Sequence, residues 1–206
     1  MLFNILALIS LLIITLLLRR MVGVFPSLMA CMIRWKENVN LQASLKLRTD
    51  RDLLTFALLL PFCLTVHRFR LYDPQFLQDF GDDARLGLLI AIFTAYLLLR
   101  IACRLIFRQA STPKSVYKGA ADSARTFFIV LSLLLLAVGG VLAFLNVNNT
   151  AIKDAMICIS GAIYAIFLIR KTQIFYSSCS LFVSFLYLCA LEILPTGVLI
   201  ASAVIF

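Results

Sequence analysis

Six long apolar runs alternate with shorter polar stretches along this chain of 206 residues. A helix needs roughly 20 residues to cross a bilayer core of about 30 Å, and several of the runs approach that length. The pattern predicts an all-α fold, a polytopic transmembrane helical bundle of about six spans in a single integral-membrane domain over 1–206. We expect the spans at residues 2–18, 53–72, 86–107, 126–145, 152–169 and 174–194.

The segment after the first span is apolar but too short to cross a membrane. It runs from Met21 to Ile33, contains Pro26, and leads into the basic and aromatic run Arg34-Trp35-Lys36. Basic and aromatic side chains are typical of the headgroup level. We therefore predict a cytoplasmic interfacial segment here. In the second span we expect Pro61 to kink the helix, because proline removes one backbone hydrogen bond.

The last apolar run, 174–206, has 33 residues and one charge, Glu192. As a single helix it would be about 50 Å long, which exceeds a bilayer core, whereas two spans need roughly 40 residues plus a turn. We predict one span that ends near residue 194. A helix break at Pro195 and Gly197 should follow, with 195–206 as a re-entrant or interfacial tail.

Composition supports a membrane protein, since 63% of the residues are hydrophobic and 14% are charged, against about 25% charged in a soluble domain. The net charge is +9. Fifteen of the lysines and arginines fall in the odd-numbered connections between predicted spans and four in the even-numbered ones. This is the positive-inside asymmetry. It predicts a multi-pass protein with both termini outside, and it explains the basic charge without nucleic acid.

The residues that would build a metal site or an active site are scarce. The six cysteines form no CxxC pair, and there is one histidine, His67. We therefore expect no metal and no cofactor. Catalysis needs a nucleophile with a base, paired acids or clustered ligands, and no such constellation is evident. The sequence predicts no catalytic residues.

Glu192 is the main candidate for a functional ionisable residue, because a charge inside a membrane usually has a role. Counted from Ile174, it lies eighteen residues along the helix, about 27 Å, close to the outer boundary. There it would pair with Arg68, Arg70 or Lys153 as a structural carboxylate. The alternative is a carboxylate that handles protons or cations, with His67 either as a partner or as a simple polar cap.

A basic surface is predicted on the cytoplasmic side. Arg100, Arg104 and Arg108 recur every four residues and so share one helix face, and Lys114 and Lys118 follow. One interpretation places the arginines among anionic lipid headgroups. The other is a docking stripe for a cytosolic partner or an acidic lipid.

One stretch near the C-terminus carries a family resemblance: FLYLCALEILP at 185–195. It resembles the C-terminal signature of a Bacteroidota inner-membrane family, domain of unknown function 4271. The resemblance implies a bacterial cytoplasmic (inner) membrane and no known activity. It also gives weight to Glu192 and Pro195, which belong to the recognised stretch.

Three functions fit these observations. The leading hypothesis is a non-enzymatic subunit or scaffold that packs against other membrane proteins or copies of itself, through small residues such as Gly161 and Ala165. The alternative is a proton- or ion-coupled transporter that uses Glu192. This predicts a water-accessible cavity beside Glu192, whereas a dry and fully paired carboxylate would argue against it. A membrane-embedded enzyme would require acids or nucleophiles converging at one depth.

Overall fold

The computed structural model describes residues 2–33, 45–106, 114–176 and 181–205, and every long element among them is a helix. The elements are α1 (Leu2–Ile33), α3 (Leu45–Ala57), α4 (Leu59–Arg68), α5 (Gln75–Gln78), α6 (Asp82–Ile106), α7 (Lys114–Phe144), α8 (Asn149–Tyr176), α9 (Leu181–Leu188), the π-helical turn η1 (Cys189–Ile193) and α10 (Leu194–Ile205). The all-α prediction is confirmed.

Within the described residues, five helices are long and apolar enough to cross a membrane. The qualifying segments are Leu2–Met32, Asp82–Cys103, Asp122–Phe144, Asn149–Tyr176 and Ser184–Ala203. The predicted span at 53–72 is instead shared by α3 and α4, of 13 and 10 residues. The interruption at Leu58 lies just before Pro61, whose missing N–H leaves the Ala57 carbonyl without its α-helical donor.

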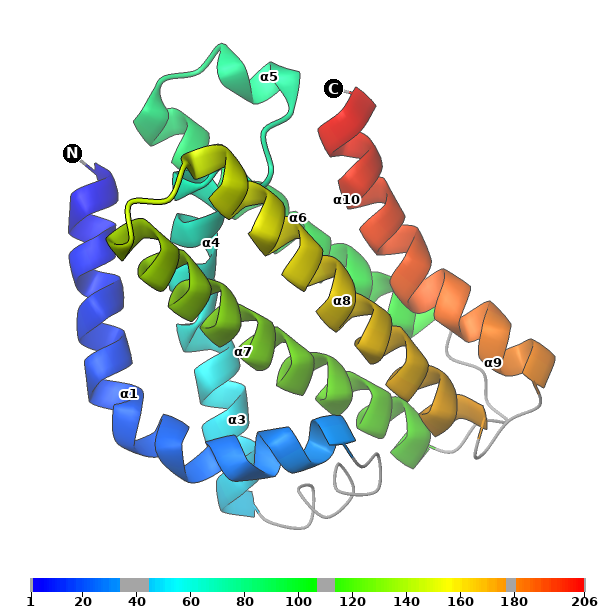
Figure 1. Cartoon of the computed structure of the whole chain (residues 1–206). Coiled ribbons are helices and arrows are strands. Elements are labelled where there is room, and N and C mark those ends of the chain that lie inside the picture. The colour runs from blue at the N-terminus through cyan, green and yellow to red at the C-terminus, as the bar shows by residue number, and fades with distance from the viewer. Residues whose placement is uncertain (1, 34–44, 107–113, 177–180, 206) are drawn as a thin grey trace.

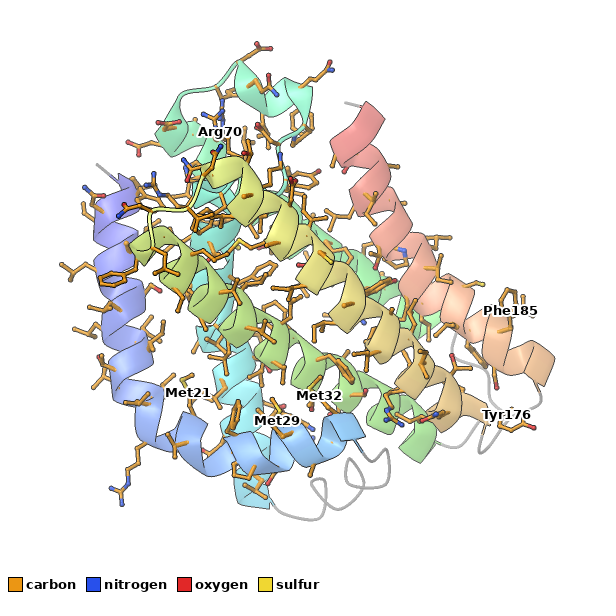
Figure 2. The ribbon with its side chains drawn as sticks, in the orientation of Figure 1. Met21, Met29, Met32, Arg70, Tyr176 and Phe185 are labelled. Atoms are coloured by element: carbon orange, nitrogen blue, oxygen red, sulfur yellow. The ribbon has the colours of Figure 1, made fainter. Side chains whose placement is uncertain are left out.

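The first helix bends where the interfacial segment was predicted. The first half of α1 runs along the bundle, and after Met21 the helix turns and crosses one end of it (Figures 1 and 2). Val24, Leu28 and Cys31 are buried, at a helical spacing that places them on one face. The first two belong to an apolar cluster with α3, the α3–α4 junction and α7. The run Arg34-Trp35-Lys36 lies outside the described residues.

The main core lies between α4, α6, α7 and α8 and includes Phe62, Leu89, Leu135 and Met156. The helices α7 and α8 form an antiparallel hairpin across it (Figure 1). They approach closely at Gly139, where a side chain would collide with the terminal methyl of Met156.

The two ends of the bundle differ in what they contain. The start of α1, the short helix α5, the α7–α8 turn and the end of α10 lie at one end (Figure 1). The other end, which we call the elbow end, contains the bend of α1, the starts of α3 and α7, and the last turns of α6 and α8 (Figure 1). Odd-numbered predicted connections, which hold most of the basic residues, join helices at the elbow end.

The C-terminal helix differs from the prediction. The chain is helical through Pro195 and Gly197, and the irregular turn is η1, which lies before them. In η1 the Leu194 N–H donates to the Cys189 carbonyl, five residues back. Because Pro195 has no N–H, a wider turn ahead of it costs fewer backbone hydrogen bonds than it would elsewhere. The apolar segment of this helix is Ser184–Ala203, further along than the predicted 174–194.

Two hydroxyl contacts hold α10 against the bundle. The Tyr72 hydroxyl lies 2.7 Å from Ser202 Oγ, and Tyr96 Oη lies 3.2 Å from Thr196 Oγ1. Since Ser202 Oγ already donates to the Leu199 carbonyl at 2.7 Å, Tyr72 is the donor to Ser202.

Candidate functional site

Glu192 lies on η1 and only 1% of it is exposed. It is eight residues from the start of the apolar segment Ser184–Ala203 and eleven from its end, which places it near the middle of that helix. The π-helical turn puts one extra residue into the helix, and such turns are frequent at functional sites. Both the depth and the local backbone single out this carboxylate.

Two cations from different helices form ion pairs with the Glu192 carboxylate. Arg100 of α6 pairs with Oε2 through its Nη2 atom, and Lys171 of α8 pairs with Oε1 through Nζ. The Lys171 side chain is 3% exposed and that of Arg100 is 17% exposed. Both carboxylate oxygens are therefore taken by charged donors, and the pairs connect the C-terminal helix to α6 and α8.

Aromatic side chains surround these cations. The Phe167 ring centroid lies 5.6 Å from Arg100 Cζ and 5.5 Å from Lys171 Nζ, so one ring faces both positive charges. Phe175 adds a second ring 5.9 Å from Lys171 Nζ. Attraction between a cation and the face of an aromatic ring is strongest in such water-poor surroundings. In addition, Tyr164 donates a hydrogen bond to the Glu192 backbone carbonyl at 3.3 Å.

The partners of Glu192 differ from those predicted. We expected Arg68, Arg70 or Lys153, but Arg68 and Arg70 lie at the end of α4 opposite the elbow end, and Lys153 lies in the first turns of α8. Figure 2 labels Arg70 there, in a turn with φ 48°. The prediction failed because the span register was wrong: α8 continues to Tyr176, so Glu192 lies much closer to the elbow end than a helix starting at Ile174 implies.

His67 is also at the end opposite the elbow end. Its ring centroid lies 5.8 Å from that of Phe3 in α1, and its Nδ1 atom is buried without a hydrogen-bond partner among the described residues. It lies far from Glu192 along the bundle, because it ends α4 at the opposite end. The structure therefore does not bring these two predicted residues together.

Of the predicted basic surface, Arg100 is described in full, and it pairs inward with Glu192 instead of facing water. Arg104 lies in the last turns of α6, and Lys114 and Lys118 lie in the first turns of α7. Arg108 lies outside the described residues.

A second ionic cluster, which the sequence did not predict, joins α3 to α7 at the elbow end. Arg51, fully buried, lies 2.7 Å from Asp122 and 3.4 Å from Asp52. Arg125 lies 2.8 Å from Asp52 and 3.5 Å from Asp122. We call these four residues the α3–α7 cluster. A signal was present in the sequence, since two Arg/Asp pairs flank the predicted spans, but nothing in the spacing shows that they meet.

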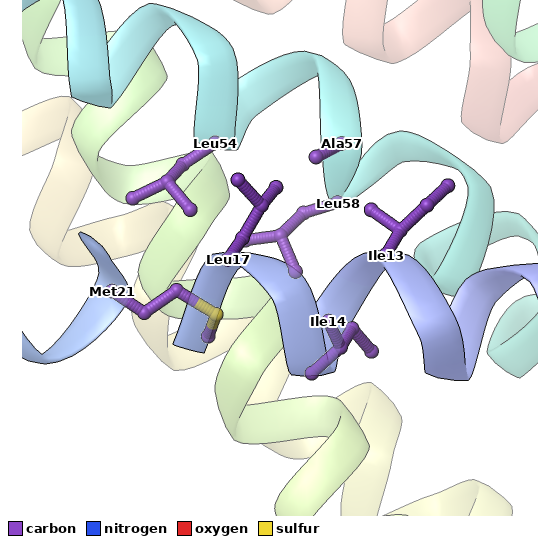
Figure 3. A pocket seen from close by; sticks show the side chains of 7 residues that line it. All are labelled: Ile13, Ile14, Leu17, Met21, Leu54, Ala57 and Leu58. Carbon is purple, nitrogen blue, oxygen red and sulfur yellow. The ribbon is translucent and has the colours of Figure 1, made fainter. Parts of the chain in front are cut away.

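A shallow depression lies between α1 and the α3–α4 junction (Figure 3). Its seven lining residues are all apolar: Ile13, Ile14, Leu17, Met21, Leu54, Ala57 and Leu58. It offers no donor, acceptor or charge for chemistry. Within the part of the chain that the structure describes, no group of three or more His, Cys, Asp or Glu side chains is placed to hold a metal ion. The Glu192 cluster is therefore the strongest candidate site.

Comparison with known proteins gives a family but no activity. No curated protein and no solved structure matches the chain. A family model described as "Domain of unknown function (DUF4271)" matches residues 3–202, nearly the whole chain. Except for Leu2 and Ala203 the match covers the five apolar segments, and it includes Arg100, Lys171 and Glu192. This chain is a member of the DUF4271 family.

Proposed function

We propose that this protein is a small, non-enzymatic subunit of the bacterial cytoplasmic membrane that assembles with other membrane proteins, with both of its termini outside. The proposal is carried by the outward face of α8. Gly161 and Ala165, one turn apart, are both exposed, and nothing lies within 4 Å of the position that a Gly161 side chain would take. Cys158 continues this small-residue face toward the start of the helix.

Small residues let helices in lipid approach closely, and lipid offers little hydrophobic drive for any other contact. The bundle uses one such position internally, because Gly139 packs tightly against α8 and Phe69. The Gly161 face is not used in this way by the described residues. A second membrane helix fits this face, from either a different protein or a second copy.

The environment of Glu192 argues against the alternative, a proton- or ion-coupled transporter. A coupling carboxylate must be reached by water and must exchange its partners. Glu192 is buried, and both of its oxygens are engaged by cations on two helices. We therefore assign it a structural role, joining the C-terminal helix to α6 and α8.

The test is purification of the tagged full-length protein in nanodiscs, with mass spectrometry of the proteins that accompany it. Gly161→Leu should abolish a stoichiometric companion while the protein itself stays folded and monodisperse. Gly140→Leu is the matched control, because Gly140 is also an open glycine but lies beside the exposed Val141 and Phe144.

A wild-type protein that purifies as a partner-free monomer would overturn the proposal. A companion protein that co-purifies equally with Gly161→Leu and Gly140→Leu would also overturn it, since the α8 face would then not be the contact.

A further inference from the structure

The short helix α5 and the residues just after it expose two phenylalanine rings at the end of the bundle opposite the elbow end (Figure 1). Phe76 is 40% exposed and Phe80 is 48% exposed, whereas Leu77, between them in the sequence, is fully buried in the main core. Water solvates large apolar rings poorly. A pair of them on one short loop therefore indicates a surface that an apolar partner covers.

Hydrogen bonds hold this loop in one conformation. The Arg85 side chain, from α6, donates to the Leu77 carbonyl at 3.1 Å and to the Gln78 carbonyl at 3.2 Å, so two carbonyls at the end of α5 have partners. The Leu77 N–H donates to the Pro74 carbonyl at 3.0 Å, and the Phe80 N–H donates to the Leu77 carbonyl at 3.3 Å. The two rings therefore project from an anchored turn.

The order of side chains around this turn separates a core face from a polar face. A helix rotates about 100° per residue, so Phe80 lies about 40° from Phe76, and Leu77 lies about 60° beyond Phe80. Asp79, which is exposed, lies about 60° from Phe76 on the other side. Gln78, also exposed, lies about 200° from Phe76. The two rings therefore lie at the border between the core face and the polar face, where a helix in the membrane interface carries its apolar side.

Both ends of this loop lie where apolar segments end. The Tyr72 hydroxyl, just before the loop, lies 2.7 Å from Ser202 Oγ, and the apolar segment of the C-terminal helix ends one residue later, at Ala203. On the other side, Phe80 comes two residues before the apolar segment Asp82–Cys103 of α6. The loop is therefore at the level where the hydrocarbon core meets the headgroups. Aromatic side chains, above all those of tryptophan and tyrosine, are enriched at this level.

The size of this apolar surface distinguishes a lipid from a protein partner. A phenylalanine side chain buries about 150–250 Å², so the two half-exposed rings offer on the order of 200 Å². A stable protein–protein interface takes about 800 Å² from each partner. The same end of the bundle carries other strongly exposed apolar side chains that would face lipid, since Phe144 is 86% exposed and Leu145 is 62% exposed. Lipid therefore fits the two rings better than a protein does.

We propose that α5 is a lipid-interface anchor: Phe76 and Phe80 enter the phospholipid leaflet at the end opposite the elbow end, near the top of the acyl chains, with Gln78 and Asp79 toward water. The anchor fixes the depth of the loop that joins α4 to α6. This goes beyond the assembly role and does not depend on it, because the Gly161 face lies on a different helix. Either proposal can therefore fail without the other.

The test is tryptophan fluorescence of the full-length protein in nanodiscs of phosphatidylcholine, with or without bromine atoms high on the acyl chains, which quench tryptophan on contact. Trp35→Phe first removes the one native tryptophan. Phe76→Trp and Phe80→Trp then each place a single reporter at one ring position. Both should lose emission to the brominated lipid to a degree similar to Phe144→Trp, the lipid-facing reference, and both should resist quenching by iodide in the buffer.

Gln78→Trp is the matched control, because Gln78 is an exposed residue of the same short helix but lies about 200° from Phe76 around it. This reporter should be quenched by iodide and should keep its emission in brominated lipid. Phe76→Trp and Phe80→Trp each replace one exposed ring with another. If one of these variants does not fold, the other still decides the test.

Quenching of both ring reporters by iodide and not by brominated lipid would place α5 in water and overturn the proposal. Protection from both quenchers would also overturn it, because a protein, either a second copy or a different partner, would then cover the rings. Equal quenching of Gln78→Trp and Phe76→Trp by brominated lipid would reject the orientation of α5 on which the proposal rests.

Discussion

Asp122→Asn is the sharpest test of the α3–α7 cluster. The substitution keeps the shape of the side chain and removes its charge. Asp122 is 2% exposed, and its nearest cation, Arg51, is fully buried 2.7 Å away. Arg51 would retain Asp52, but that carboxylate lies 3.4 Å away and is shared with Arg125 at 2.8 Å. One buried guanidinium would therefore lose its closest partner.

Loss of one member of a buried ion pair costs about 3–5 kcal/mol, because the remaining charge stays buried without compensation. That cost lowers the folding equilibrium constant by roughly two to nearly four orders of magnitude. Asp50→Asn provides the control. Asp50 also pairs with one arginine, at 3.1 Å, but that arginine, Arg20, is 52% exposed. Pairs with a solvated partner contribute about 0.2–1 kcal/mol.

The assay is unfolding by sodium dodecyl sulfate in mixed micelles, followed by circular dichroism. Asp122→Asn should unfold at a much lower detergent fraction than Asp50→Asn. The double variant Arg51→Met with Asp122→Leu should recover most of the loss, since apolar residues of similar volume often replace a buried pair without penalty. Equal midpoints for the two single variants, or a double variant as unstable as Asp122→Asn, would refute the reasoning.

Two further predictions concern close contacts in the bundle. Gly139→Ala should destabilise the fold by about 1–3 kcal/mol through overpacking, partly offset by the better helix propensity of alanine, whereas Gly140→Ala has open space and should stabilise it by up to about 1 kcal/mol. Thermal unfolding in detergent should give Gly139→Ala a lower midpoint than wild type, and the reverse order would contradict the packing. Tyr72→Phe removes the donor to Ser202 and should cost about 0.5–1.5 kcal/mol, seen as faster amide exchange at the end of α10 and unchanged exchange in α7. Uniform acceleration in both helices would show that the hydroxyl contact is not local.

The sequence was sufficient for the helical class because apolar runs of bilayer length leave few other structures. It also distinguished Met21–Ile33 from the first span, since this segment is apolar but short and bounded by basic residues, and α1 bends after Met21. Pro61 predicted the interruption of the second span to within a few residues, since the helix is interrupted at Leu58. These features depend on local patterns, which a single sequence contains.

The partners of Glu192 could not be predicted in the same way. Hydropathy treats Arg100 and Lys171 as residues leaving the membrane, because an isolated charge is costly in lipid. Pairing with Glu192 offsets the cost of these charges in lipid. Arg100 and Lys171 are 92 and 21 residues away from Glu192 in the sequence, and no local pattern predicts contacts between positions so far apart. The same limit hid the α3–α7 cluster, where the chain between Arg51 and Asp122 includes the whole of α4, α5 and α6.

The π-helical turn sets the rotation and the axial position of α10, which follows it. A helix advances about 1.5 Å and rotates about 100° per residue. If one residue were deleted within Cys189–Ile193, the turn would close to an α-helical one, and α10 would be drawn back and rotated by those amounts. Thr196 and Ser202 would then no longer face Tyr96 and Tyr72. In this segment the number of residues matters more than their identity, so a one-residue gap should harm the protein more than most substitutions there.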